Sequence, residues 1–171
     1  MLSLAAFDFD LPAGLIAQHP PRNRSDARLL HVPLAERLRA LIGEFAGATP
    51  AIGSVDIALY RDDVGVGGGR RGVVPVVGET VLDFDIEKHS VVLVDDVLYT
   101  GRTIRAAIDA VFDYGRPPRV ELAVLVDRGH RELPIRPDYV GRNLPTNRGE
   151  RITIHLAELD GSDQVLLQES T

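Results

Sequence analysis

The chain has 171 residues, of which 44% are hydrophobic and 26% charged, so it suits a single globular domain with its own core. It has no cysteine, which excludes disulfides and thiolate chemistry and fits a reducing compartment, and its formal net charge of −6 argues against non-specific nucleic-acid binding by the molecule as a whole. There is no apolar run of membrane-spanning length and no basic start, so we expect a soluble cytoplasmic protein.

The first 31 residues differ from the rest of the chain. They contain Pro12, Pro20 and Pro21 and show no sustained periodicity, so we expect an atypical N-terminal segment ahead of a domain over residues 32–171. A helical pattern starts at Pro33 and stops at Gly47. Its apolar residues share one face: Leu34, Leu38, Leu41, Ile42 and Phe45. Residues 51–60 are predicted to form a strand.

Residues 61–89 are predicted to form a long connection whose glycine-rich middle carries Arg70 and Arg71. Such a connection is either a functional lid or a flexible surface loop without a function. Residues 90–94 then have the apolar, β-branched composition of a buried parallel strand. A helical stripe follows (Ile104, Ala107, Ile108, Val111 and Phe112), and strands are predicted at 120–126, 151–158 and 164–167. This order of strand, helix and strand predicts an α/β fold with a parallel sheet.

One short stretch combines two groups that suit a sugar phosphate. Asp95 and Asp96 follow the predicted strand, where ligands bind in open α/β sheets, and their carboxylates can accept hydrogen bonds from ribose hydroxyls. Residues 100–103, Thr-Gly-Arg-Thr, then enter a helix whose free amides and dipole favour a phosphate. Gly101 lets the backbone approach the anion, and Thr100 and Thr103 add hydroxyl donors. Either half alone is common, but the whole run on a strand–loop–helix is specific.

Other kinds of site find no support. The glycines at 65–69 do not precede a helical pattern, so a dinucleotide fingerprint is not expected, and there is no Walker lysine motif. His130 and its neighbours lack the spacing of metal ligands, and no metal is assigned directly to protein side chains.

The run VVLVDDVLYTGRT at 91–103 resembles the signature of the type I phosphoribosyltransferases. Further segments resemble the bifunctional pyrimidine operon regulators / uracil phosphoribosyltransferases within that family: VPLAERL at 32–38, DIALYRDD at 56–63, LAVLVDRGHRELPI at 122–135 and DYVGRNLPT at 138–146. The resemblance covers about residues 32–168. It implies a type I phosphoribosyltransferase-like parallel sheet flanked by helices, with a small hood.

The resemblance also implies roles for individual residues. Asp95 and Asp96 would hold the ribose of 5-phosphoribosyl-1-pyrophosphate (PRPP), as the catalytic pair, and Thr100–Thr103 would cradle its 5-phosphate. Further substrate contacts are implied within the motif, at Val97, Leu98, Tyr99, Gly101 and Arg102. Arg128 would lie in the hood and Ile152 near the base. A flexible loop that covers the site would start at Tyr60, Arg61, Asp62 and Asp63. Mg²⁺ would arrive with the pyrophosphate of the substrate.

The N-terminus departs from this family. Members carry a pyrophosphate-binding Thr-Arg-Gly loop just before the position of Val32, where this chain has Leu29, Leu30 and His31. The segments DFDLP at 8–12, LIAQHP at 15–20 and SDARLL at 25–30 instead resemble the opening of the tRNA ribosyltransferase-isomerase of queuosine synthesis. The missing loop puts the rate of catalysis in question.

Three hypotheses remain open from the sequence. The first is an enzyme that converts uracil and PRPP to UMP and pyrophosphate while regulating a pyrimidine operon. The second is a non-catalytic, UMP-sensing regulator that binds the leader of pyrimidine mRNA, a role that the eight arginines against five acids between Arg116 and Arg151 favour slightly. The third, a tRNA-modifying fragment, is supported by the N-terminus alone. A homo-oligomer without membrane contact is expected.

Overall fold

A computed structural model describes residues 31–58, 60 and 80–169. Most of the atypical N-terminal segment, three residues predicted to start the covering loop (Arg61, Asp62 and Asp63) and the two loop arginines Arg70 and Arg71 lie outside the described residues. No helix in the described ranges is long and apolar enough to cross a membrane.

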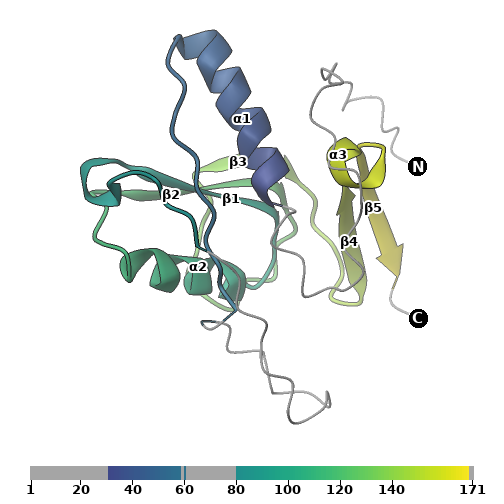
Figure 1. The fold of residues 1–171 in the computed structure, drawn as a ribbon. Helices are drawn as coiled ribbons and strands as arrows, with labels where there is room; N and C mark the ends of the chain where they lie inside the picture. Colours follow the sequence, from purple (N-terminus) through teal and green to yellow (C-terminus); the bar gives the residue numbers. More distant parts are fainter. Residues whose placement is uncertain (1–30, 59, 61–79, 170–171) are drawn as a thin grey trace.

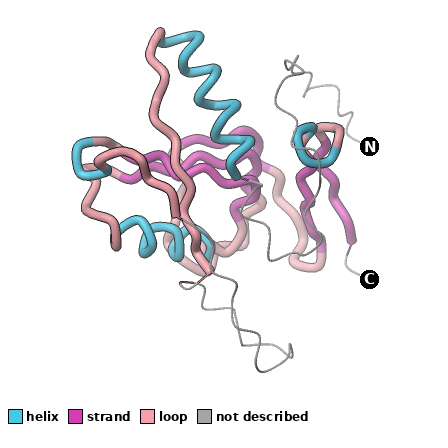
Figure 2. Tube along the Cα trace, viewed as in Figure 1, coloured by secondary structure: helices cyan, strands magenta, loops and turns pink. Residues whose placement is uncertain are grey.

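Three parallel strands form the main sheet in the order β1 (Val91–Leu98), β2 (Val120–Asp127) and β3 (Tyr139–Asn143). Helix α2 (Arg102–Phe112) connects β1 to β2, as the pattern of strand, helix and strand predicts. Figure 2 shows the three strands side by side, with long loops leading from β2 to β3 and onward to the separate hairpin. The sheet brings the carboxyl ends of β1 and β2 together, because Leu98 pairs with Asp127.

Helices α1 (His31–Ala46) and α2 lie on opposite sides of this sheet (Figure 1). The first helix buries Leu34 in a cluster with Val126, Ile152, Ile154 and Leu156. The second helix buries Ile104 in a cluster with Leu98, Leu122 and Val124. Burial of these side chains, worth roughly 2 kcal/mol for each large aliphatic residue, holds the helices against the strands.

An antiparallel hairpin stands beside the main sheet. It consists of β4 (Glu150–His155) and β5 (Gln164–Glu169), joined through the short helix α3 (Ala157–Asp160) and a turn at Gly161. A short 3-10 helix, η2 (Ile86–Lys88), precedes β1. These strands confirm the two predicted near the C-terminus, although the strand predicted at 151–158 ends at His155 and its last two residues belong to α3.

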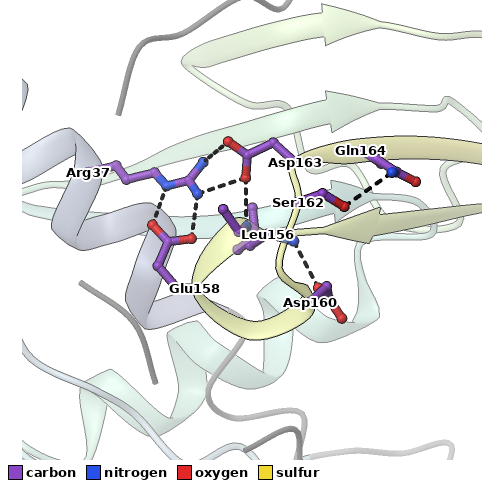
Figure 3. Close-up of polar contacts among 8 residues, drawn as sticks. Arg37, Leu156, Glu158, Asp160, Ser162, Asp163 and Gln164 are labelled. Atoms are coloured by element: carbon purple, nitrogen blue, oxygen red, sulfur yellow. Dashed lines mark hydrogen bonds and ion pairs between the residues drawn. The ribbon is translucent and has the colours of Figure 1, made fainter. Parts of the chain in front are cut away.

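One arginine ties α1 to the hairpin (Figure 3). The Arg37 guanidinium donates to both carboxylate oxygens of Glu158, with an Nε–Oε1 distance of 2.6 Å, and also to Asp163, with an Nη2–Oδ1 distance of 2.8 Å. Burial opposes the charge on Arg37, yet the hydrogen bonds from the two carboxylates outweigh it and raise the arginine's pKa. The same arginine lowers the pKa of Asp163, although partial burial acts to raise it. The N-terminal half of α1 is therefore fixed by charge as well as by Leu34.

Several sequence predictions need correction. The predicted strand at 51–60 is absent from the described residues there, which make only an isolated bridge between Ser54 and Val81. The apolar alternation at Ile57 was misleading because a strand needs a neighbour, and here the Asp56 amide bonds the Thr80 hydroxyl instead. β1 is longer than predicted and runs to Leu98.

The apolar face predicted for α1 is only partly buried. Leu34 is 8% exposed, but Leu41 is 45% and Phe45 83% exposed, so the helix points its C-terminal half away from the described sheet. The stripe on α2 is also shifted, because Ala106 and Ala110 are fully buried in addition to Ile104 and Val111. The 3.6-residue period identified both helices correctly and left open how far each face is covered.

Candidate sugar-phosphate site

The two acidic residues of the motif lie inside β1 rather than after it. Asp95 pairs with Val124, and the pairing continues at Val97 with Val126. Consecutive residues of a strand point to opposite faces, so the two side chains leave β1 in different directions. Asp95 is buried, with 6% exposure, whereas Asp96 is half-buried. We therefore expect Asp96 to be the more accessible of the pair.

Both carboxylates are oriented by the backbone that follows them. The Asp96 amide donates to Asp95 Oδ1 at 2.9 Å, and the Val97 amide donates to Asp96 Oδ1 at 2.6 Å. The next side chains of the motif face the core: Val97 packs against the cluster around Val126, and Leu98 is 1% exposed.

The turn after β1 has the geometry that the motif predicts. Gly101 precedes α2 with a φ of +91°, a left-handed conformation that favours glycine, and it provides no side-chain cap for the helix. The Arg102 amide makes a long bond of 3.4 Å to the Thr100 hydroxyl, and the half-buried Thr103 lies in the first helical turn. A helix start without a side-chain cap, next to two hydroxyls, is suited to an anion such as the 5-phosphate.

The segment after β2 crosses over the end of β1 and binds this turn. The Arg128 amide donates to the Leu98 carbonyl at 3.1 Å, and the Glu132 and Leu133 amides donate to the Thr100 carbonyl at 3.0 and 3.2 Å. A Cβ added at Gly101 would lie 3.3 Å from Ile135 Cδ1, so the segment also packs on the turn from above. Arg102, in addition, pairs with Glu132, with an Nε–Oε2 distance of 2.8 Å.

Arg128 lies in this hood segment, as predicted, but its side chain faces the protein. It is 6% exposed, stacks over the Tyr99 ring at 4.2 Å, and donates to the Thr146 hydroxyl and to the carbonyls of Asn147 and Glu150. A surface salt bridge, the ordinary role of an arginine, is not its role here.

Arg131 fixes the carbonyl side of the same turn. Its Nη1 donates to the Tyr99 carbonyl at 2.8 Å, and its Nη2 to Asp127 Oδ2 at 2.5 Å. Burial acts to raise the pKa of Asp127, but the hydrogen bonds from Arg131 and from the Gly129 amide outweigh this effect and lower that pKa. The Asp127 carboxylate is therefore held ionised beside the site.

The other predicted residues are more dispersed. Ile152 is 8% exposed and lies in the core cluster with Leu34 and Val126, so it forms part of the packing behind the site. Tyr60 lies at the far end of α2, where its hydroxyl bonds the Asp113 carboxylate. Among the described residues, no group of three histidine, cysteine or acidic side chains is arranged to hold a metal ion.

Sequence reasoning missed part of this arrangement. The resemblance placed the segment after Arg128 in the hood, but the contacts of His130 and Arg131 with Tyr99 were not predicted. In the structure Arg131 donates to the Tyr99 carbonyl, and the His130 ring meets the Tyr99 ring. It also missed β3 as a strand, because Gly141 weakens strand patterning there. In the structure this glycine has a packing role, since a Cβ at that position would lie 2.7 Å from the Leu125 carbonyl oxygen.

Comparison with known proteins places this geometry in a family. Residues 38–157 match the phosphoribosyl transferase domain. The chain is 56% identical to the bifunctional protein PyrR of Chloroflexus aurantiacus over 136 residues, which cover 80% of this chain and 72% of that protein. It is 54% identical to that of Clostridioides difficile, with 81% and 76% covered, and 55% identical to that of Thermus thermophilus, with 81% and 74% covered.

Solved structures with similarity include a hypoxanthine-guanine phosphoribosyltransferase from Bacillus anthracis, at 24% identity and a TM-score of 0.37, where 40% of each chain is covered. A hypoxanthine phosphoribosyltransferase from Trypanosoma cruzi, in complex with the product IMP, is 30% identical with a TM-score of 0.36, covering 42% of this chain and 39% of that one. Both matches span well under half of the solved chains. None of the relatives named here supports the resemblance of the first 31 residues to the queuosine enzyme.

The motif at 91–103, the parallel sheet with flanking helices and the extent of these matches confirm the predicted fold and family. The chain belongs to the type I phosphoribosyltransferase family and, within it, to the bifunctional pyrimidine regulators with uracil phosphoribosyltransferase activity that its sequence resembles.

Proposed function

We propose that this chain transfers the ribose 5-phosphate group of PRPP to uracil, which forms UMP and releases pyrophosphate. The observation that carries the proposal is the turn from β1 into α2. It combines a half-buried Asp96, a left-handed Gly101 and a helix start without a side-chain cap within one short stretch. This combination matches the chemistry of one ribose phosphate.

In this proposal each end of the stretch binds a different part of the sugar. Asp96 accepts hydrogen bonds from the ribose hydroxyls, and the buried Asp95 holds the backbone amide of Asp96. The Gly101–Thr103 amides and the hydroxyls of Thr100 and Thr103 bind the 5-phosphate. The uracil lies under the hood that starts at Arg128, on the side of Ile152. Mg²⁺ would arrive on the pyrophosphate of the substrate, whose negative charge it would offset.

The expected rate is lower than in relatives that carry the Thr-Arg-Gly loop. Pyrophosphate gains charge as its bond to the sugar breaks, so donors aimed at it act mainly on the rate. In the sequence, the positions of that loop are taken by Leu29, Leu30 and His31. Replacing residues 1–31 by the family's own N-terminal segment should raise kcat much more than it tightens UMP binding.

The direct test is UMP formation from uracil and PRPP by the purified chain with Mg²⁺. We expect slow but measurable turnover that is lost in Asp96→Asn. Asp109→Asn is the matched control, because Asp109 is an exposed acid on α2 that pairs with Arg105 and should not affect turnover. An unaltered chain that forms no UMP and shows no thermal shift with millimolar PRPP or UMP would refute the site.

A second function, binding of a pyrimidine mRNA leader, is favoured by the exposure of particular arginines. Arg136, Arg142, Arg148 and Arg151 are exposed, whereas Arg128 and Arg131 are occupied with internal acceptors. Exposed arginines can neutralise phosphates, with an affinity that falls steeply with salt. Charge reversal of Arg136 and Arg142 should abolish leader binding and leave UMP formation intact, as a filter-binding titration at two salt concentrations would show.

We also propose a cytoplasmic homo-oligomer. The apolar face of α1 supports association, because Leu41, Ile42 and Phe45 are 45%, 44% and 83% exposed and lie within two turns of one another. A second copy of the chain, with an equal apolar face, is the occupant we propose. Light scattering should give a mass above 18.6 kDa for the parent and a lower mass for Phe45→Glu.

A further inference from the structure

The Tyr99 ring lies between two residues of the hood. Arg128 stacks on one side, with its Cζ 4.2 Å from the ring centroid. The His130 ring meets it edge-on, with centroids 5.9 Å apart. Tyr99 is the first residue after β1, at the start of the phosphate turn (residues 99–102), so its ring joins this end of the turn to the hood, while Arg102 pairs with Glu132 at the other end.

The two partners of Tyr99 bind the same distant stretch of chain. Arg128 donates to the Thr146 hydroxyl at 3.0 Å and to the Glu150 carbonyl at 2.6 Å. His130 Nε2 donates to the Thr146 carbonyl at 2.5 Å. Thr146 lies in the loop that enters β4, and Glu150 is the first residue of that strand, which also carries Ile152. A continuous set of contacts thus runs from the phosphate turn to the side of the site proposed for the base.

The backbone of the hood is held in an unusual conformation to make these contacts. Gly129 has a φ of +81°, and His130, which is not a glycine, has a φ of +60°. Left-handed backbone at a residue with a Cβ costs about 1–2 kcal/mol and persists only where surrounding contacts enforce it. The edge-on contact of the His130 ring with Tyr99 and the bond to Thr146 are such contacts.

We propose that Tyr99 and Arg128 are positioning residues, which form a clamp that joins the 5-phosphate turn to the strand entering the base side of the site. The proposal rests on the proposed transferase function, which it deepens by assigning these two residues. Arg128 acts through Tyr99 and the 146–150 loop rather than by binding uracil, because its Nε and Nη2 already donate to protein acceptors.

The clamp has a kinetic signature. The 5-phosphate does not change during the transfer, so a loosened turn weakens substrate and transition state alike. Such a change raises KM and leaves kcat almost unaltered. Loss of the ring should therefore raise the KM for PRPP by about tenfold, since that corresponds to one modest contact at about 1.4 kcal/mol per tenfold.

The experiment compares Tyr99→Leu, Tyr99→Phe and Arg128→Lys in the full chain, assayed with uracil, PRPP and Mg²⁺ well below each melting temperature. Tyr99→Leu should raise the KM for PRPP about tenfold and change kcat less than about threefold. Tyr99→Phe keeps the stack and should rescue KM to within about twofold. Arg128→Lys keeps the charge but not the planar fork, so it should resemble Tyr99→Leu. Tyr114→Leu, which removes an exposed ring at the end of α2, is the matched control.

Amide hydrogen exchange provides a readout that needs no catalysis. Tyr99→Leu should speed exchange in residues 101–103 and 146–150 together, whereas Tyr114→Leu should speed neither. A folded Tyr99→Leu with the parent's KM for PRPP and unchanged exchange at 146–150 would overturn the clamp. A parent that forms no UMP and binds neither PRPP nor UMP would refute the proposed function, and exchange at 146–150 would then decide the clamp by itself.

Discussion

The phosphate turn and helix α1 are held in very different ways. The turn at residues 99–102 is bound by three backbone or side-chain donors from the hood and by two ring contacts, all from residues 128–133. Among the described residues, helix α1 is fixed mainly over its N-terminal half, by Leu34 and Arg37, and it leaves Phe45 83% exposed. The phosphate turn is fixed by contacts with the hood. Within the described residues, helix α1 instead leaves part of its apolar face without a partner.

This difference explains how a sugar-phosphate site can persist behind an atypical N-terminus. The contacts that shape the turn come from residues 95–150, which lie inside the stretch that matches the family. The contacts that would cover α1 must come from another copy or from chain outside the described residues. We therefore expect ligand binding to be robust to changes in α1, and stability to be sensitive to them.

The largest expected effect separates the two ends of α1. Leu34→Ala should destabilise the chain by about 2–5 kcal/mol, because it leaves a cavity in the cluster with Val126 and Ile152. Phe45→Ala should change the free energy of unfolding by less than about 0.5 kcal/mol in a monomer, since surface changes usually do. Urea unfolding at low protein concentration measures both. Equal losses for the two variants would show that the C-terminal half of α1 is covered after all.

The next effect tests the ionic anchor of the same helix. Arg37→Met leaves the carboxylates of Glu158 and Asp163 without their shared partner, and Glu158 is only 11% exposed. We expect a loss of about 2 kcal/mol, between that of exposed and fully buried pairs. Arg39→Met is the control, because its pair with Glu36 is 40% and 35% exposed and should cost less than about 0.5 kcal/mol. UMP binding should be unchanged in both, which thermal shifts with and without UMP would reveal.

The same contrast marks what the sequence could and could not predict. Local chemistry was readable: the glycine before α2, the hydroxyls beside it and the strand–helix–strand order all follow from residue type and spacing. Long-range pairing was not readable. Three features depend on residues far away in the chain. They are the strand pairing of residues 51–58, the exposure of Phe45 and the bond from Arg128 to the Glu150 carbonyl. The family and the function were predicted correctly because the motif is local.

A smaller effect should follow from glycine substitution in the turn. Gly101→Ala forces a Cβ into a left-handed position at a cost of about 1–2 kcal/mol. It also presses on Ile135, whose Cδ1 would lie 3.3 Å away. Gly161→Ala is the matched control, because its φ is +79° and nothing lies within 4 Å of its Cβ. Both variants should lose similar stability, but only Gly101→Ala should weaken UMP binding, as calorimetry would show. Equal UMP affinity in the two would mean that the turn does not bind phosphate.

The smallest expected effect concerns acid, and it probes both regions at once. Asp127, beside the turn, and Asp163, beside α1, both have lowered pKa values, because their bonds to Arg131 and Arg37 outweigh the opposite effect of burial. A carboxyl whose pKa is lower in the folded state stabilises the fold fully above its unfolded value of about 3.9, and this contribution is lost as the pH falls through the folded value. Stability should therefore decline below about pH 5, and Asp127→Asn or Asp163→Asn should each flatten that decline. Each substitution should cost less than about 1 kcal/mol at pH 7, because both ion pairs are partly solvated.

Only Asp127→Asn should also reduce the acid sensitivity of UMP binding, since Asp163 lies in the anchor of α1 rather than beside the turn. Urea midpoints and UMP titrations between pH 7 and pH 3 separate the two regions, with Asp109→Asn as the exposed control. An unchanged acid profile of UMP binding in Asp127→Asn would show that the bond from Asp127 to Arg131 does not support the site.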